Sequence, residues 1–189
     1  MKNEIVVFDT ETSGMPDWKM PSEADNQPHI VQLAAVVVDT QKRNIKQSIN
    51  VIVKPSGWLI DPETTKIHGI TTEYAMDVGI SEGLAIEMFI ELVKGKTRVA
   101  HNTTFDNRII RIGLKRYFPD KADAFKELPY YCTLQNSRKI MGGKSGHTLA
   151  EALKHFTGKD LVNAHNAMAD TLGCMDLYFG IQDNLSQEN

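Results

Sequence analysis

The sequence lacks the features of a secreted or membrane-spanning protein. Its only cysteines, Cys132 and Cys174, belong to no paired-cysteine metal motif. Two cysteines make no disulfide framework, so we expect reduced thiols. The N-terminus lacks the basic-then-apolar order of a signal peptide, and no apolar run reaches membrane-spanning length. These absences predict an intracellular, cytoplasmic protein.

An excess of positive charge is also absent. The 21 Lys and Arg residues are outnumbered by 24 Asp and Glu residues, so the formal net charge is −3. The basic field that often accompanies nucleic-acid binding is therefore missing. Bound divalent cations would reverse the local sign of an acidic site, so the charge does not exclude a nuclease.

The 189 residues fit one domain, with no repeat, low-complexity block or linker. Short β-branched runs predict strands at 5–9, 30–38, 47–53 and 97–100. Helical spacing and capping residues predict helices beginning near 61–63 and over 81–93, 105–118, 132–141, 149–156 and 167–181. We expect an α/β domain over 1–181, in which an antiparallel meander comes first and helices cover a central sheet. Residues 14–29 read as a loop or flap, and 182–189 as a frayed polar tail.

Two carboxylates close the first predicted strand. Asp9 and Glu11 flank Thr10 after four apolar residues, and residues i and i+2 of a strand point to the same side. Such a pair repels unless a cation lies between the two acids. A solvated turn is the alternative interpretation, but the apolar run indicates a buried strand end, where ligand sites are common.

A second polar segment, 101–107, joins a short strand to a helix. Asp106 would lie in the first helical turn, with Thr103 or Thr104 as the N-cap. Considered in isolation, Asp106 is explained by the helix dipole, and His101 by a structural hydrogen bond.

The third segment places His165 five residues before Asp170. Within one helix, that spacing would turn the side chains roughly 140° apart. The two can meet if His165 lies in the loop before the helix, Asn166 caps it, and Asp170 projects from its first turn. Exposed His and Asp side chains are the alternative. The four acids and one histidine of the three segments suit Mg²⁺ or Mn²⁺ better than zinc.

Together these segments resemble the histidine-containing branch of the DEDD exonucleases, which includes the proofreading epsilon subunit of bacterial DNA polymerase III. The matching segments are 8–14, 101–106 and 165–170, and 67–71 matches a short connecting motif of the family. The resemblance extends from Ile5 to about Phe179. A related branch carries tyrosine four residues before its last acid, where this chain has Asn166.

The resemblance implies a ribonuclease H-like fold with a mixed five-stranded sheet, and a 3′–5′ exonuclease that releases 5′-mononucleotides. It implies two Mg²⁺ ions, for which Mn²⁺ can substitute. Asp9, Glu11 and Asp170 would hold one ion, and Asp9 would bridge to the second with help from Asp106. His165 would take the proton of the attacking water.

The resemblance also implies contacts with the last nucleotide of the substrate. The backbone over 10–12, including Thr10 and Thr12, would hold the 3′ terminus, and His68 and Asn102 would lie near it. Met15 would wedge against the last base. For Phe105, packing in the core and contact with substrate are equally supported.

The loop over residues 16–29 is longer than in the compact family pattern and carries Trp18. It could be a flap over a single strand, with Trp18 as a stacking surface, a partner-docking element or an inert insertion; we favour the flap. Basic residues lie on one helical face and around the glycine-rich loop, where they are either a solvated surface or phosphate contacts. These are Arg108, Arg111, Lys115, Arg138, Lys139 and Lys144.

Single-stranded or frayed DNA 3′ ends are the favoured substrate, because the segment 101–106 resembles the proofreading enzymes more than the oligoribonucleases. An exoribonuclease and a non-catalytic end-binding module are the alternatives. The complete set of five residues disfavours the non-catalytic module. The chain ends soon after the predicted fold, so we expect a free-standing bacterial or phage-type exonuclease in repair or recombination, without a stable polymerase or clamp partner.

Overall fold

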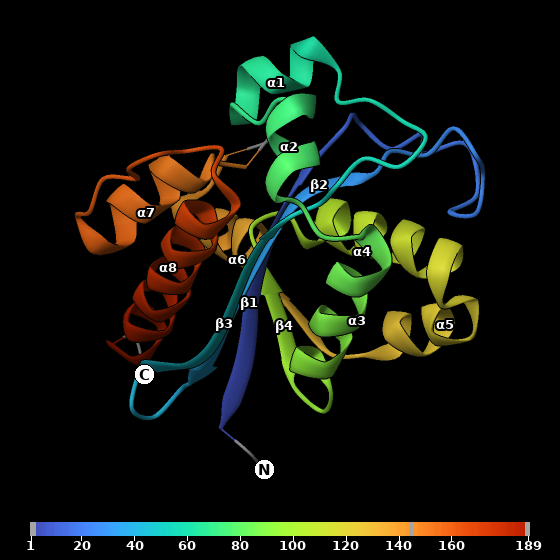
Figure 1. Ribbon diagram of the computed structural model, residues 1–189. Coiled ribbons are helices and arrows are strands. Elements are labelled where there is room, and N and C mark those ends of the chain that lie inside the picture. The colour runs from blue at the N-terminus through green and yellow to red at the C-terminus, as the bar shows by residue number, and fades with distance from the viewer. Residues whose placement is uncertain (1–2, 144–145, 188–189) are drawn as a thin grey trace.

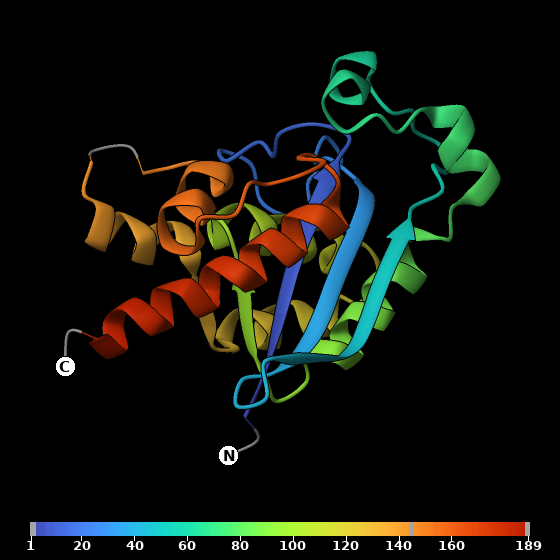
Figure 2. The ribbon, with the colours of Figure 1, turned by 90° about the vertical axis from the view of Figure 1, so that its left-hand side faces the viewer.

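The computed structural model describes residues 3–143 and 146–187. Its centre is a five-stranded sheet in the order β3-β2-β1-β4-β5 (Figures 1 and 2). The first three strands pair antiparallel, whereas β4 and β5 continue the sheet in parallel with β1. This arrangement confirms the mixed sheet and the antiparallel meander. The strands are β1 Glu4–Thr12, β2 Ile30–Asp39, β3 Asn44–Ile52, β4 Thr97–Ala100 and β5 Tyr130–Cys132.

Helices cover both faces of this sheet, and two more lie at one of its ends (Figures 1 and 2). Figure 1 shows α3 Glu82–Val93, α4 Thr103–Tyr117 and α5 Pro119–Glu127 on one side. The other side carries α6 Thr133–Met141, α7 Leu149–Thr157 and α8 Ala167–Gln187, and the end carries α1 Pro62–His68 and α2 Thr72–Val78. Within the described ranges, none of these helices has the length and apolar character needed to span a membrane.

Strand β1 is buried on both faces because its side chains alternate between two cores. Val6 and Phe8 pack in the larger core with residues of α3, α4 and α5. Ile5 and Val7 pack in the smaller core with α8. A strand covered on both faces reads as a continuous apolar run, which explains why β1 and β2 were identifiable from sequence.

Local capping signals predicted several helix starts correctly. The Asp61 carboxylate accepts a hydrogen bond from the Glu63 backbone N–H at 2.8 Å, and the Ser81 hydroxyl accepts one from the Leu84 backbone N–H at 3.3 Å. The prediction omitted α2, α5 and β5, which are short. Pro119 explains one omission, because it ends α4 and is also the first residue of α5, where its missing N–H carries no cost.

The last helix is longer than predicted. It runs to Gln187, so the prediction of a frayed tail is wrong for residues 182–187. The Gln182 side chain donates a hydrogen bond to the Tyr131 hydroxyl at 3.1 Å, which attaches this turn to β5. Residues 188–189 lie outside the described part of the chain. Cys132 and Cys174 are buried and free, as expected.

Candidate active site

Three carboxylates meet where β1 passes the start of α8. Asp9, Glu11 and Asp170 each offer an oxygen, and these oxygens lie within 4.8 Å of one another. Asp9 and Glu11 lie on the β1 face that α8 covers, because they are two residues apart and continue the register of Ile5 and Val7. The fold thus unites the first and third sequence segments.

The geometry around Asp170 matches the expected loop-then-helix arrangement. His165 has a left-handed φ of 65° and precedes α8. The Asn166 side-chain oxygen accepts hydrogen bonds from the backbone N–H groups of Met168 and Ala169, both at 3.2 Å, so Asn166 caps the helix. The His165 backbone N–H donates to Asp170 Oδ2 at 3.0 Å. His165 and Asp170 therefore lie side by side.

Gln32 also positions α8, and nothing in the sequence pattern marks it. It is opposite Glu11 in the β1–β2 ladder and is only 3% exposed. Its side-chain oxygen accepts the Ala167 N–H at 3.1 Å, and its amide donates to Asn50 at 2.9 Å. Gln32 thereby holds the first turn of α8 against β2, beside the strand β1 that carries Asp9 and Glu11.

Asp106 reaches the site from α4 rather than α8. It is buried in the first turn of α4, as predicted. Its Oδ1 accepts hydrogen bonds from the Thr10 backbone N–H at 3.2 Å and the Thr10 hydroxyl at 2.9 Å. Asp106 does not belong to the cluster of three carboxylates within 4.8 Å, but its charge acts on Asp9.

The N-cap of α4 was predicted incorrectly. It is Asn102 rather than Thr103 or Thr104, and it makes no side-chain cap hydrogen bond. Asn102 has φ 75°, a left-handed conformation that asparagine tolerates better than most residues. Thr103 and Thr104 are already the first residues of the helix.

Burial and mutual repulsion make these acids reluctant to ionise without a cation. Burial, followed by the charges of Asp106, Glu11 and Asp170, raises the pKa of Asp9 well above its ordinary value. Burial and the Asp170 charge raise the pKa of Glu11 to about 7. Burial raises the pKa of Asp106 to about 7, although the Thr10 hydrogen bonds oppose this shift. A positive ion would reverse this electrostatic preference.

The donor set fits a hard divalent cation. Asp9, Glu11 and Asp170 offer carboxylate oxygens, the ligands preferred by Mg²⁺ and related ions. Within the described residues, Asp170 Oδ1 is buried and has no hydrogen-bond partner. A buried carboxylate oxygen without a partner is costly, and coordination of a cation would satisfy it.

The predicted substrate-contact residues lie in different environments. Thr10 and Thr12 are buried in β1, whereas Asn102 is exposed. Met15 projects from the flap and is 73% exposed. Phe105 is half-buried and packs against the larger core, so both of its expected roles remain compatible with its position.

His68 reaches the same region from α1. Burial lowers its pKa, the nearby Thr12 carbonyl opposes the shift, and the charge of His165 lowers it further. Its Nδ1 accepts the Ile70 N–H at 3.1 Å. The structure thus brings the 67–71 motif to the end of β1.

His101 forms structural hydrogen bonds, as the sequence predicted for this residue considered alone. Its ring nitrogens contact the Thr133 hydroxyl and the His147 carbonyl, each at 3.0 Å. These bonds connect the end of β4 to α6 and to the segment before α7. Burial lowers the pKa of His101.

Comparison with known proteins decides the family. The RNase T model, described as an exonuclease family, matches residues 6–178. The chain belongs to this exonuclease family. The exonuclease is similar to DNA polymerase III subunit epsilon of Buchnera aphidicola subsp. Acyrthosiphon pisum, with 26% identity over 195 residues, 100% of this chain and 78% of the relative. It is 28% identical to the Escherichia coli K12 epsilon subunit over 179 residues, 93% of this chain and 70% of the relative.

Solved structures show that the exonuclease has a ribonuclease H-like fold, as expected. E. coli exonuclease I in complex with a dT13 oligonucleotide matches with a TM-score of 0.74 and 22% identity, covering 98% of this chain and 43% of that chain. Exonuclease I from Methylocaldum szegediense matches with a TM-score of 0.74 and 21% identity, covering 97% of this chain and 41% of that one. The exonuclease thus spans about two fifths of these solved chains.

Proposed function

We propose that the exonuclease removes 5′-mononucleotides from the 3′ ends of single-stranded or frayed DNA. The observation that carries this proposal is the cluster of Asp9, Glu11 and Asp170, in which Asp170 Oδ1 is buried and has no hydrogen-bond partner in the described part of the chain. Asp106 and His165 complete the set of five. Family membership supplies the reaction class, and the cluster supplies a place for the chemistry.

Asp9, Glu11 and Asp170 would hold one divalent ion, and Asp9 with Asp106 would hold a second. Mg²⁺ suits these oxygen donors, and Mn²⁺ would replace it. When bound, the ions supply positive charge that stabilises the negative charge developing on the phosphate oxygens. The carboxylates themselves fix the position of that charge, because β1, α4 and α8 hold them from three directions.

His165 takes the proton of the attacking water in this proposal. Its side chain is exposed, while its backbone is held by the bond to Asp170 and by the cap at Asn166. A neutral imidazole nitrogen can accept a proton, as a general base must. The residue therefore moves a proton without ligating an ion.

The terminal nucleotide would lie along β1 and the neighbouring flap. Thr10 and Thr12 would border the sugar and phosphate, and Met15 would contact the last base. In this proposal His68, Asn102 and Phe105 would also border the terminal nucleotide. The relatives support DNA as the substrate, because they include DNA polymerase III subunits and an exonuclease I in complex with a dT13 oligonucleotide.

Digestion of end-labelled strands tests this proposal. Single-stranded DNA, blunt duplex DNA and RNA of one sequence are incubated with Mg²⁺, Mn²⁺ or chelator. We expect a 3′ label to leave at once as a mononucleotide and a 5′ label to give a shortening ladder, fastest on single-stranded DNA and absent in chelator. Immediate release of the 5′ label would reverse the polarity, and faster RNA loss would make RNA the substrate.

A further inference from the structure

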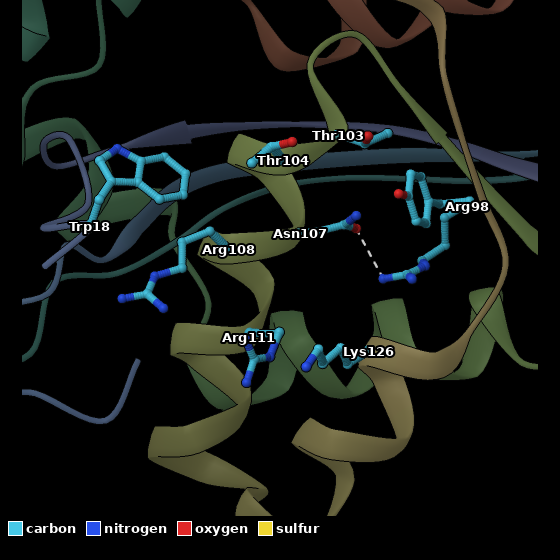
Figure 3. Close-up of a pocket in the computed structure, with 9 residues that line it drawn as sticks. Trp18, Arg98, Thr103, Thr104, Asn107, Arg108, Arg111 and Lys126 are labelled. Atoms are coloured by element: carbon cyan, nitrogen blue, oxygen red, sulfur yellow. Dashed lines mark hydrogen bonds between the residues drawn. The ribbon is translucent and has the colours of Figure 1, made fainter. Parts of the chain in front are cut away.

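A concave surface, the flap cleft, lies beside the N-terminal half of α4. Its volume is about 370 Å³. Trp18 of the 14–29 flap, Arg98 of β4, Arg108 and Arg111 of α4, Lys126 of α5 and Tyr130 of β5 line it. Figure 3 shows Trp18 at the flap end and Arg111 facing Lys126 across the cleft.

The cleft concentrates positive charge in an acidic protein. Four of its lining residues are arginine or lysine and none is acidic, although the whole chain has a formal net charge of −3. Asp123 lies 3.9 Å from Arg111, but Asp123 is 78% exposed, so this pair is screened by solvent. Lys126 forms no ion pair within the described residues. A negatively charged ligand is the expected occupant.

One of the positive charges, that of Arg98, is buried and held by contacts with neighbouring residues. It is 1% exposed, its guanidinium lies 4.0 Å from the centre of the Phe125 ring, and it donates to Asn107 at 2.9 Å and to the Leu128 carbonyl at 2.6 Å. Its Nε is buried without a partner in the described structure. None of these neighbours is a carboxylate, so Arg98 is a buried cation that has no counter-ion among residues 3–143 and 146–187. Such a charge is costly unless an anion approaches it.

Aromatic surfaces accompany these charges. Trp18 is 53% exposed and Tyr130 is 56% exposed. Exposed rings beside a basic groove are typical of sites for single-stranded nucleic acid, where bases stack and phosphates meet cations. Arg108 also holds the flap in place by donating to the carbonyls of Asp17 and Met20. Arg108, one of the three arginines that line the cleft, therefore also helps to set the position of Trp18.

The cleft adjoins the carboxylates through the first turn of α4. Thr103 and Thr104 line the cleft, and Asp106 in the same turn is bonded to Thr10 of β1. Met15, on the flap, is also exposed toward solvent. A strand with its last nucleotide at the carboxylates could therefore continue past the flap to the cleft.

We infer that the flap cleft binds an internal phosphate of the substrate strand while Trp18 stacks on a neighbouring base. This inference rests on the proposed function, since it assumes that the 3′ end lies at the carboxylates. A free mononucleotide offers the same chemistry, a phosphate beside a base. Strand length distinguishes the two sources.

Charge reversal at Lys126 tests the inference in the full-length protein. Lys126→Glu is compared with Lys121→Glu, which makes the same change on the same helix outside the cleft. Hydrolysis of a single-stranded 20-mer is compared with hydrolysis of the p-nitrophenyl ester of thymidine 5′-monophosphate, which is too short to reach the cleft. We expect Lys126→Glu to raise KM for the 20-mer about tenfold, with a weaker salt dependence, and to leave ester hydrolysis unchanged. An equal effect of Lys121→Glu, or no dependence on length, would overturn the inference.

Fluorescence tests the inference without hydrolysis. Trp18 and Trp58 are the only tryptophans, so Trp58→Phe leaves Trp18 as the reporter. In chelator, we expect a 20-mer to quench Trp18 and excess thymidine monophosphate to quench it little. Equal quenching by the monophosphate would overturn the strand assignment. If the wild type cleaves neither substrate but the 20-mer still quenches Trp18, the proposed function fails and the cleft assignment stands.

Discussion

Thr10 donates two hydrogen bonds to a single oxygen of Asp106, one from its backbone N–H at 3.2 Å and one from its hydroxyl at 2.9 Å. Thr10 points to the α4 side of β1, whereas Asp9 and Glu11 point to the α8 side. The contact therefore brings a fourth acid to the site from the opposite face of the strand. It also holds the start of α4 against β1.

Thr10→Val tests this contact. Valine keeps the shape of threonine but removes the hydroxyl donor to a buried carboxylate. We expect a loss of about 1–3 kcal/mol in the free energy of unfolding, measured in urea, and slower cleavage at neutral pH because the pKa of Asp106 rises further. Thr10→Ser keeps the hydroxyl and should retain more of both properties. Equal behaviour of the two variants would show that the hydroxyl contributes nothing.

Without metal, the protein should lose stability as the pH rises. Burial raises the pKa of Glu11 and Asp106 to about 7, so the folded state binds their protons more tightly than the unfolded state does. That contribution is complete below the unfolded pKa of about 4–4.5 and is lost as the pH rises through about 7. We expect the Tm in chelator to be several degrees higher at pH 5 than at pH 8, given about 2–4 °C for each kcal/mol.

Two controls assign this pH dependence to the carboxylates. Glu11→Gln removes one of the titrating groups and should flatten the Tm profile in chelator. Saturating Mg²⁺ should restore stability at pH 8, because a bound cation favours the ionised acids. A profile that neither change alters would place the titration elsewhere.

Asp170→Asn should weaken metal binding and cleavage together. The substitution removes the charge of a carboxylate that carries a buried, unpartnered oxygen. We expect Mn²⁺ affinity by calorimetry and the cleavage rate each to fall by at least about 100-fold. Asp176→Asn, on the same helix and paired with Lys159, should change neither by more than a small factor. Retained affinity in Asp170→Asn would exclude Asp170 as a ligand.

His165→Asn should separate proton transfer from metal binding. We expect kcat to fall by about 10²–10⁴, the contribution typical of a general base, while Mn²⁺ affinity stays unchanged. The matched control is His155→Asn, the same substitution at an exposed histidine of α7. Loss of metal in His165→Asn would show that the imidazole is a ligand instead.

Arg116→Ala should release the flap. Arg116 donates to the carbonyls of Gln27 and Pro28 and lies 3.6 Å from the buried carboxylate of Glu82. We expect faster hydrogen exchange over 14–29 and a stability loss of about 2–3 kcal/mol. The neighbouring Lys115 pairs with Asp123 instead, so Lys115→Ala should leave flap exchange unchanged.

For the flap, the sequence predicted the type of structure but not the contacts that hold it. Its Gly and Pro content excluded a regular element, and it is a loop in the structure. The hydrogen bonds that connect its parts were not predictable. The Gln27 side chain is 2% exposed, accepts from the Asp17 N–H at 3.1 Å and donates to the carbonyls of Asp17, Met20 and Pro21. A glutamine with this role looks like any other polar loop residue in the sequence.

For the basic residues too, the sequence predicted only part of the group that the structure brings together. Helical spacing grouped Arg108, Arg111 and Lys115 on one face of α4. Arg108 and Arg111 line the flap cleft, whereas Lys115 is not among its lining residues. Only the structure shows that Arg98 and Lys126 join the two arginines there. The partners come from β4 and α5, and α5 was not predicted. Lys144, which was grouped with the glycine-rich loop, lies outside the described residues.

By itself, the sequence determined what depends on neighbouring residues. The apolar runs identified four of the five strands, Asp61 and Ser81 marked helix starts, and the spacing of His165, Asn166 and Asp170 defined a loop, a cap and a first turn. Tertiary structure decided which distant groups meet. Thr10 and Asp106 lie 96 residues apart, and Gln32 and Ala167 lie 135 apart. Local propensity carries no information about such pairs, because they form only when β1, β2, α4 and α8 pack together around the carboxylates.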